Sequence, residues 1–191
     1  MKYLSFDLEA TGLAEHDLII EFGLIPFCAK TKTLQENLAK HWFIKCPSFE
    51  SLKPKLDQWV IDHNKELIEK AHSEGTEMAQ FKAELSEYIK SPEVCEYFEG
   101  EKIILFGKSM NAIDLPFMTR DLGWDFMREH FHHQVLDMSS VAMAFADKEI
   151  LPDACRSGGG LMKHFNMGEV AHTALEDAKN VALLYFESLK S

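Results

Sequence analysis

Cysteine is scarce in this sequence, and the few cysteines are too far apart to build a metal site or a disulfide framework. The four residues, Cys28, Cys46, Cys95 and Cys155, form no CxxC pair. Their scatter excludes zinc-ribbon and disulfide-stapled folds and is typical of a reducing compartment. We therefore expect a cytoplasmic protein with free thiols.

Long apolar runs are also missing. No stretch approaches the roughly 20 apolar residues that a membrane-spanning helix needs. The acidic residue Asp7 arrives too early for the charged and apolar regions of a secretory signal. We expect neither a membrane span nor a secretory leader, and no membrane partner.

Positive charge is the third shortage. The 20 Lys and Arg residues stand against 31 Asp and Glu, which gives a formal net charge of −11. Proteins that hold long nucleic acids neutralise many phosphates with Lys and Arg, so the net charge argues against long nucleic acid as the partner. Two interpretations remain open: the protein ignores nucleic acid, or it handles very short pieces through a metal-filled pocket.

The elements that are present indicate one α/β domain over residues 1–191. The chain is 46% hydrophobic and 27% charged, an ordinary globular balance. Hydrophobic periodicity predicts strands at 3–8, 18–28, 37–45, 102–107 and 134–137. It predicts helices at 64–90, divided at Gly75 with Thr76 as the second N-cap, and at 115–122, 139–145 and 173–189. Residues 47–54 are expected to form a loop, and Gly158 to Gly160 to interrupt the chain before residues 161–165.

Two acids at the end of the first predicted strand are the first candidates for chemistry. Residues i and i+2 of a strand point to the same face, so Asp7 and Glu9 should project together. Paired carboxylates repel each other unless a cation lies between them. Solvent-exposed decoration is the alternative, although the following Thr11, Gly12 and Leu13 favour a functional turn.

Two further acids lie at predicted helix starts. Asp114 opens a helix after the buried strand that ends at Gly107, and Asp177 lies in the first turns of the last helix, five residues after His172. Helix capping and the helix dipole favour acids at such positions without any catalytic role. Each acid taken alone therefore leaves both interpretations open.

The ordered combination of these motifs resembles the DEDDh branch of the DEDD exonucleases, within the RNase H-like superfamily. That family includes oligoribonuclease, ribonuclease T and the proofreading subunit of bacterial replicative polymerase. The resemblance spans nearly the whole chain. It implies an RNase H-like α/β fold with a five-stranded mixed sheet flanked by helices, a 3′→5′ exonuclease releasing nucleoside 5′-monophosphates from single-stranded nucleic acid, and a homodimer.

Several segments look most similar to oligoribonuclease, which implies short RNA as the substrate. These are the WVIDH stretch containing Trp59 and His63, the Gly-x-Ser turn at Ser109, and the LDMSSV segment at 136–141. Other features depart from it. Asn111 marks one extra residue before Asp114, Gln134 replaces an arginine that helps to hold the substrate's terminal phosphate, and residues 158–165 are more like ribonuclease T or the proofreading subunit. A DNA-directed or ribonuclease T-like exonuclease is therefore the alternative.

The resemblance also implies roles for single residues. Asp7 would bridge two divalent ions, Glu9 and Asp177 would bind one of them, and Asp114 would act through water. Oxygen ligands suit Mg²⁺ or Mn²⁺. His172 would accept the proton of the attacking water, a role that its near-neutral pKa suits.

Seven residues are candidates for substrate binding. Leu13 is similar to a wedge beside the 3′-terminal bases, with a plain core leucine as the alternative. Trp59 and His63 are candidates for base stacking, against a packing Trp and a surface His. Ser109 would donate to a phosphate or only close its turn. The remaining candidates are Thr11, Gly12 and Asn111. A nucleic-acid-binding module with an inactive site would lack one of the five catalytic candidates, and all five are present.

Overall fold

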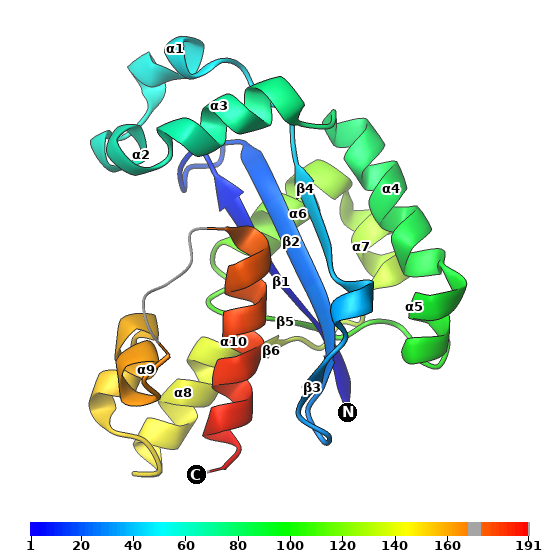
Figure 1. The fold of residues 1–191 in the computed structure, drawn as a ribbon, viewed down its shortest axis with the longest axis vertical. Coiled ribbons are helices and arrows are strands. Elements are labelled where there is room, and N and C mark those ends of the chain that lie inside the picture. Colours follow the sequence, from blue (N-terminus) through cyan, green and yellow to red (C-terminus); the bar gives the residue numbers. More distant parts are fainter. Residues whose placement is uncertain (168–172, 191) are drawn as a thin grey trace.

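The computed structural model describes residues 1–167 and 173–190, which form a mixed β-sheet with helices on both faces (Figure 1). The strand order is β3-β2-β1-β5-β6, and β4 also pairs with β2. The pairs among β1, β2, β3 and β4 are antiparallel, whereas β5 is parallel to both β1 and β6. The strands are β1 (Lys2–Ala10), β2 (Ile19–Cys28), β3 (Thr33–Leu34), β4 (Lys40–Phe43), β5 (Leu105–Gly107) and β6 (Leu136–Asp137).

The predicted mixed sheet is confirmed, and the described part of the chain contains six strands rather than five. The extra strand is β3, which precedes the predicted strand at 37–45, and that predicted strand is shortened to β4. A 3₁₀ turn at Glu36–Leu38 separates β3 from β4, and both strands pair with β2. Both β3 and β4 pair with the long, almost fully buried β2, which also pairs with β1.

Helices account for most of the remaining structure. They are α1 (Phe49–Leu52), α2 (Gln58–His63), α3 (Lys65–Glu74), α4 (Met78–Lys90), α5 (Pro92–Tyr97), α6 (Asp114–Leu122), α7 (Trp124–His130), α8 (Met138–Asp147), α9 (Gly158–His164) and α10 (Ala174–Ser188), with 3₁₀ turns at Lys53–Lys55 and Asp153–Arg156. The sequence did not predict α2, α5 and α7. Each has only six or seven residues, too few for a clear periodic pattern. None of the described helices is long and apolar enough to span a membrane.

Three local predictions were wrong. Thr76 does not cap α4, because its backbone extends the sheet: its N–H donates to Phe43 O at 2.8 Å, and its carbonyl accepts from Lys45 N at 2.9 Å. The stretch Gly158 to Gly160 opens α9 instead of interrupting the chain, and the Ser157 hydroxyl caps that helix by accepting from Gly160 N at 3.1 Å. The predicted loop at 47–54 contains α1.

The alternation of β1 divides the core into two layers. Leu4, Phe6 and Leu8 point to one face, where they pack with α4, α5, α6 and α7. Tyr3 points to the opposite face and packs with α8, α9 and α10. Figure 1 shows α10 crossing that face in front of β1 and β2, with α6 and α7 behind the sheet. The residues Ser5, Asp7 and Glu9 share the α10 face by parity.

Close packing fixes the start of α10 against the sheet. Gly23 of β2 pairs with Asp7 of β1, and a Cβ at Gly23 would collide with the backbone of Leu175. Ser5 is fully buried, and its hydroxyl donates to the carbonyl of Ala178 at 2.6 Å. The first turns of α10, including Asp177, are therefore held next to the carboxyl end of β1.

Candidate active site

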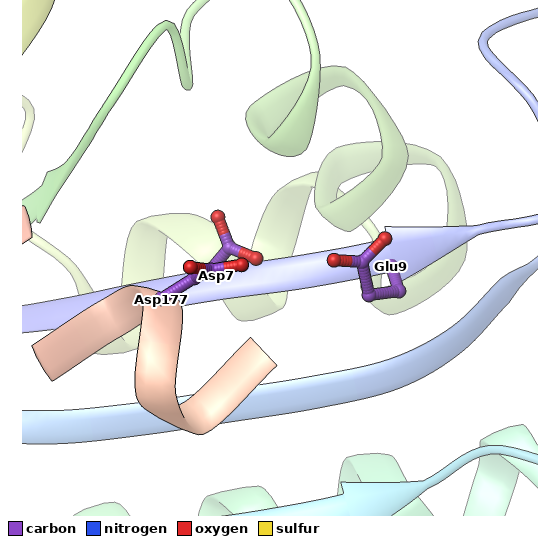
Figure 2. Close-up of side chains that lie close together, drawn as sticks. All are labelled: Asp7, Glu9 and Asp177. Carbon is purple, nitrogen blue, oxygen red and sulfur yellow. The ribbon is translucent and has the colours of Figure 1, made fainter. Parts of the chain in front are cut away.

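Three carboxylates meet where α10 begins and β1 ends. Side-chain oxygens of Asp7, Glu9 and Asp177 all lie within 4.8 Å of one another. In Figure 2 the Glu9 carboxylate, from further along β1, points toward those of Asp7 and Asp177. The expectation that Asp7 and Glu9 project together is therefore confirmed. The pairing of β1 with β2 shifts register directly after Glu9, an irregularity of the kind that often lies beside active sites.

Asp114 reaches the same region from the first turn of α6. It is 5% exposed, and backbone N–H groups, including that of Leu8, hydrogen-bond to its carboxylate and lower its pKa. Burial outweighs them, and with a contribution from Asp137 the pKa of Asp114 rises to about 6. A helix-capping role alone does not explain an acid that is buried beside other acids.

Burial and mutual repulsion disfavour negative charge throughout this group. Burial, followed by the charges of Asp114, Glu9 and Asp177, raises the pKa of Asp7 well above its usual range. Burial and the charges of Asp177, Glu21 and Asp114 raise the pKa of Glu9 to about 7. A bound cation reverses both effects, because it stabilises the ionised form of every carboxylate around it.

The donor set fits a hard divalent cation. Asp7, Glu9 and Asp177 each offer carboxylate oxygen, and Asp114 lies close enough to raise the pKa of both Asp7 and Glu9. Oxygen-only donors are typical of Mg²⁺ and Mn²⁺ sites. Within residues 1–167 and 173–190, Asp7, Glu9 and Asp177 form the group of His, Cys, Asp and Glu side chains whose geometry suits a metal ion.

The carboxylates lie in an open cleft of about 680 Å³. Four of the predicted substrate-binding residues, Gly12, Leu13, Trp59 and Ser109, line it. Leu13 is 76% exposed and Trp59 is 61% exposed, so the alternative interpretations as a core leucine and a packing tryptophan are wrong. Two large apolar side chains in a cleft that also holds acids are suited to contact the bases and sugars of a nucleotide.

Neighbouring residues hold these apolar side chains in place. The His63 ring stacks on the Trp59 ring with centroids 4.6 Å apart, and its Nδ1 lies 2.7 Å from Trp59 O. Thr11 is buried; its hydroxyl donates to Asp17 Oδ1 at 3.0 Å and accepts from Leu18 N at 2.9 Å. Thr11 therefore closes the loop that carries Leu13, and its side chain does not line the cleft.

The turn before Asp114 has a more structural character than the sequence suggested. Ser109 has a φ of +57°, and its N–H donates to Asp137 Oδ1 at 3.1 Å. Its hydroxyl lies 2.9 Å from that of Ser139. Asn111 is exposed and does not line the cleft, and the same holds for Gln134. Ser109 thus closes the turn and also borders the cleft.

His172, the predicted base, lies outside the described residues. The neighbouring Thr173 caps α10, since its hydroxyl accepts from Glu176 N at 3.4 Å, which confirms the predicted start of the helix.

Sequence reasoning missed several residues that line the cleft. Asn180 lies three residues after Asp177 on α10, and the helical spacing alone would have placed both side chains on one face. Lys108 directly follows β5, one residue before the predicted Ser109. Asp57 and Asn64 flank α2, a helix that the sequence did not predict.

A mixed sheet covered by helices, with acids converging from its central strand and two helices, is an RNase H-like α/β fold. A family model described as "Exonuclease" (RNase T) matches residues 4–185, and the chain therefore belongs to this exonuclease family. No curated protein matches it significantly.

Solved structures share the fold at low sequence identity. Cell-death related nuclease 4 (CRN-4) superposes with a TM-score of 0.72 at 13% identity, covering 99% of this chain and 64% of that one. The nuclease domain of 3′hExo, a DEDDh family member bound to rAMP, gives 0.64 at 12% identity, covering 99% and 92%. E. coli exonuclease I in complex with a dT13 oligonucleotide gives 0.65 at 16% identity, covering 98% and 40%. The chain thus spans under two thirds of CRN-4 and of exonuclease I, and nearly all of the 3′hExo domain.

Proposed function

We propose that the protein is a metal-dependent 3′→5′ exonuclease that releases nucleoside 5′-monophosphates from single-stranded nucleic acid, with short RNA oligonucleotides as its substrates. The observation that carries the proposal is the convergence of Asp7, Glu9 and Asp177 in an open cleft, with Asp114 buried beside them. Membership of the exonuclease family supports the reaction class.

Asp7, Glu9, Asp114 and Asp177 would hold two divalent ions, Mg²⁺ or Mn²⁺. When bound, such ions activate water, neutralise the phosphoryl oxygens and support the leaving oxygen. Asp7 and Glu9 are fixed by the pairing of β1 with β2, and Asp177 by the packing of α10 on Gly23. The rigid mounting holds the acids in place while substrate enters. His172 is proposed as the base that accepts the proton of the attacking water.

The cleft and the charge of the protein favour a short strand as the substrate. Leu13 and Trp59 present exposed apolar surface to the cleft, where they would contact the terminal bases without selecting their sequence. A net charge of −11 repels a long phosphate backbone away from the metal site. A scavenger of very short oligonucleotides, similar to oligoribonuclease, needs few phosphate contacts and is compatible with this charge.

A DNA-directed exonuclease is the second candidate. It is favoured by the structural likeness to E. coli exonuclease I, whose structure contains a dT13 oligonucleotide. The likeness to the 3′hExo nuclease domain bound to rAMP supports RNA instead. Residues 158–165, which are similar to ribonuclease T or the proofreading subunit, include α9, where Gly158 and Met162 line the cleft.

Digestion of 5′-labelled RNA and DNA ladders from two to twenty-four nucleotides, in Mg²⁺ or Mn²⁺, tests the proposal. We expect rapid loss of RNA two- to five-mers while long strands remain. Efficient trimming of long DNA would instead favour the second candidate. If no ladder is cut under conditions in which a control nuclease cleaves the same ladders, the exonuclease proposal fails. A binding module then becomes the better interpretation. Size-exclusion chromatography with light scattering on the same samples tests the homodimer that the family resemblance implies.

A further inference from the structure

One cation borders the cleft among its many acids. Of the described residues that line it, Lys108 alone is a lysine or arginine. It is half-buried, and it lies in the turn between Gly107, which ends β5, and Ser109. In a chain with a net charge of −11, a lysine placed at the candidate metal site is the feature most in need of a physical reason.

The Lys108 side chain has a defined course. It runs across the start of α9, where a Cβ at Gly158 would lie 2.6 Å from Nζ and 3.2 Å from Cδ and Cε. Any other residue at 158 would have to displace the lysine. The absence of a side chain at Gly158 therefore leaves room for the Lys108 side chain at the edge of the cleft that both residues line.

Lys108 lines the same cleft as Asp7, Asp114 and Asp177, so its charge acts on these central carboxylates. Among the described residues, however, no salt bridge engages Lys108. The ammonium group therefore lies within electrostatic range of the acids without being bound by them, and its N–H groups remain able to donate to an anion in the cleft.

A divalent cation bound by the acids would repel this lysine. Bound Mg²⁺ neutralises the acids and repels a neighbouring ammonium, so a lysine at this place weakens metal binding. The repulsion is offset when an anion binds in contact with both the Mg²⁺ ion and the lysine ammonium group. The phosphate of a nucleotide is such an anion, and a lysine is a common point charge for holding it.

We propose that Lys108 binds the phosphate of the 3′-terminal nucleotide, and that it holds the same group as the 5′-phosphate of the released monophosphate. This inference rests on the proposed exonuclease function. The lysine would neutralise charge on a non-bridging phosphoryl oxygen, and it would hold the phosphate between the metal-binding acids and the start of α9. Gln134, which stands where the resembled family has a phosphate-holding arginine, does not line the cleft. Lys108 would supply a phosphate contact there instead.

The proposal makes two predictions of opposite sign for Lys108→Met, which keeps most of the side-chain volume and removes the charge. The affinity for AMP in saturating Mg²⁺ should fall about tenfold or more, because a charge-assisted hydrogen bond is lost. The affinity for Mg²⁺ alone should rise about threefold, because a repelling charge is removed. A purely structural role would lower both affinities together.

Isothermal titration of the full chain measures both quantities with three probes: Mg²⁺ alone, AMP, and adenosine, which lacks the phosphate. Lys148→Met, an exposed lysine outside the cleft, is the matched control and should change neither affinity. Lys108→Arg keeps the charge and should restore most of the AMP affinity. Adenosine, measured by competition, should bind wild type and Lys108→Met equally.

The outcomes separate this inference from the proposed function. If wild type binds Mg²⁺ and AMP and Lys108→Met binds AMP equally well, Lys108 does not hold the phosphate, and the exonuclease proposal stands. If Lys108→Met loses AMP, adenosine and Mg²⁺ affinity together, the lysine is structural and the inference is overturned. If wild type binds neither AMP nor Mg²⁺ and cuts no ladder, the proposed function fails, and this inference fails with it.

Discussion

The two faces of β1 use the same strand for different purposes. On one face Leu4, Phe6 and Leu8 are all at most 7% exposed and pack against the helices behind the sheet. On the other face the strand begins with buried Tyr3 and Ser5 and then presents Asp7 and Glu9, whose charged forms burial disfavours. One face therefore stabilises the fold, and the end of the other carries acids whose charges reduce stability and which, under the proposed function, would bind a cation.

Substitutions on the two faces of β1 should therefore have different effects. Changes on the apolar face should reduce stability and affect activity only through unfolding. Changes to the acids should abolish activity and leave the metal-free protein equally stable or more stable. A protein in which both faces responded alike would contradict the division.

The largest effect is expected for activity at Asp7. Asp7→Asn removes a charge from the centre of the group of acids and should lower kcat on a dinucleotide by about 10³-fold or more. The metal ions of the proposed mechanism would lose their central ligand, and the charge of the transition state would be less stabilised. The melting temperature without metal should not fall. Asp125→Asn on the surface of α7 is the control and should retain full activity. A variant that retained a tenth of wild-type activity would remove Asp7 from the catalytic site.

The largest stability effect is expected at Phe6, next to Asp7 on the opposite face. Phe6 is 2% exposed and stacks against Phe22 with ring centroids 5.7 Å apart. Phe6→Ala should lower the free energy of unfolding by about 3–5 kcal/mol, as measured by urea denaturation. Activity per folded molecule should remain within about threefold of wild type at low temperature. A large loss of kcat in fully folded protein would show that the two faces are not independent.

How far the sequence predicts this division is clear from individual residues. The parity of a strand was sufficient to place Asp7 and Glu9 together, because i and i+2 share a face wherever the strand lies. The meeting of Asp177 and Asp114 with them depends on the packing of helices far along the chain. Spacing alone could not predict it, and family resemblance supplied the expectation.

Other failures have the same physical origin. Thr76 is a good helix cap by its chemistry, but pairing with the end of β4 competes for its backbone and prevails. Lys108 carries no local pattern that separates it from any other surface lysine. Only the fold brings it to the cleft beside Gly158. Tertiary contacts, rather than local propensity, decided both cases.

The third prediction concerns the stability cost of the acids and its dependence on pH. The pKa of Glu9 is about 7 in the folded protein, above its ordinary value of 4.5, so the folded state holds a proton that the unfolded state has released. Stability therefore falls as the pH rises from about 4.5 to 7, and the full cost is present above pH 7. Glu9→Gln removes that cost and should stabilise metal-free protein at pH 8 by on the order of 2 kcal/mol.

Thermal unfolding in EDTA at pH 5 and pH 8 measures this effect. The gain from Glu9→Gln should be present at pH 8 and mostly lost at pH 5. Saturating Mg²⁺ at pH 8 should reverse its sign, because wild type gains a bound ion that the variant holds poorly. Glu66→Gln, on the exposed side of α3, should show no such pattern. An equal gain at both pH values would mean that the burial of Glu9 does not disfavour its charge.

The smallest effect is expected at the edge of the cleft, where two tryptophans of nearly equal exposure provide an internal control. Trp59 is 61% exposed and lines the cleft, whereas Trp124 is 66% exposed and does not line it. Because base stacking contributes about 1–3 kcal/mol per base, Trp59→Ala should raise KM for a dinucleotide about tenfold. Trp124→Ala should leave KM unchanged. Neither substitution should shift the melting temperature appreciably, since both rings are largely in solvent.

Substitution of His63 separates two possible roles of Trp59, stacking on a base and positioning the acids. Trp59 stacks on His63, so a His63→Ala variant leaves the indole in the cleft but removes its supporting ring. If Trp59 binds a base, His63→Ala should raise KM by less than Trp59→Ala and leave kcat unchanged. If the substitution of Trp59 instead lowers kcat and leaves KM unaltered, the ring acts on the geometry of the acids. Trp59 on α2 would then position the acids of β1 rather than bind substrate.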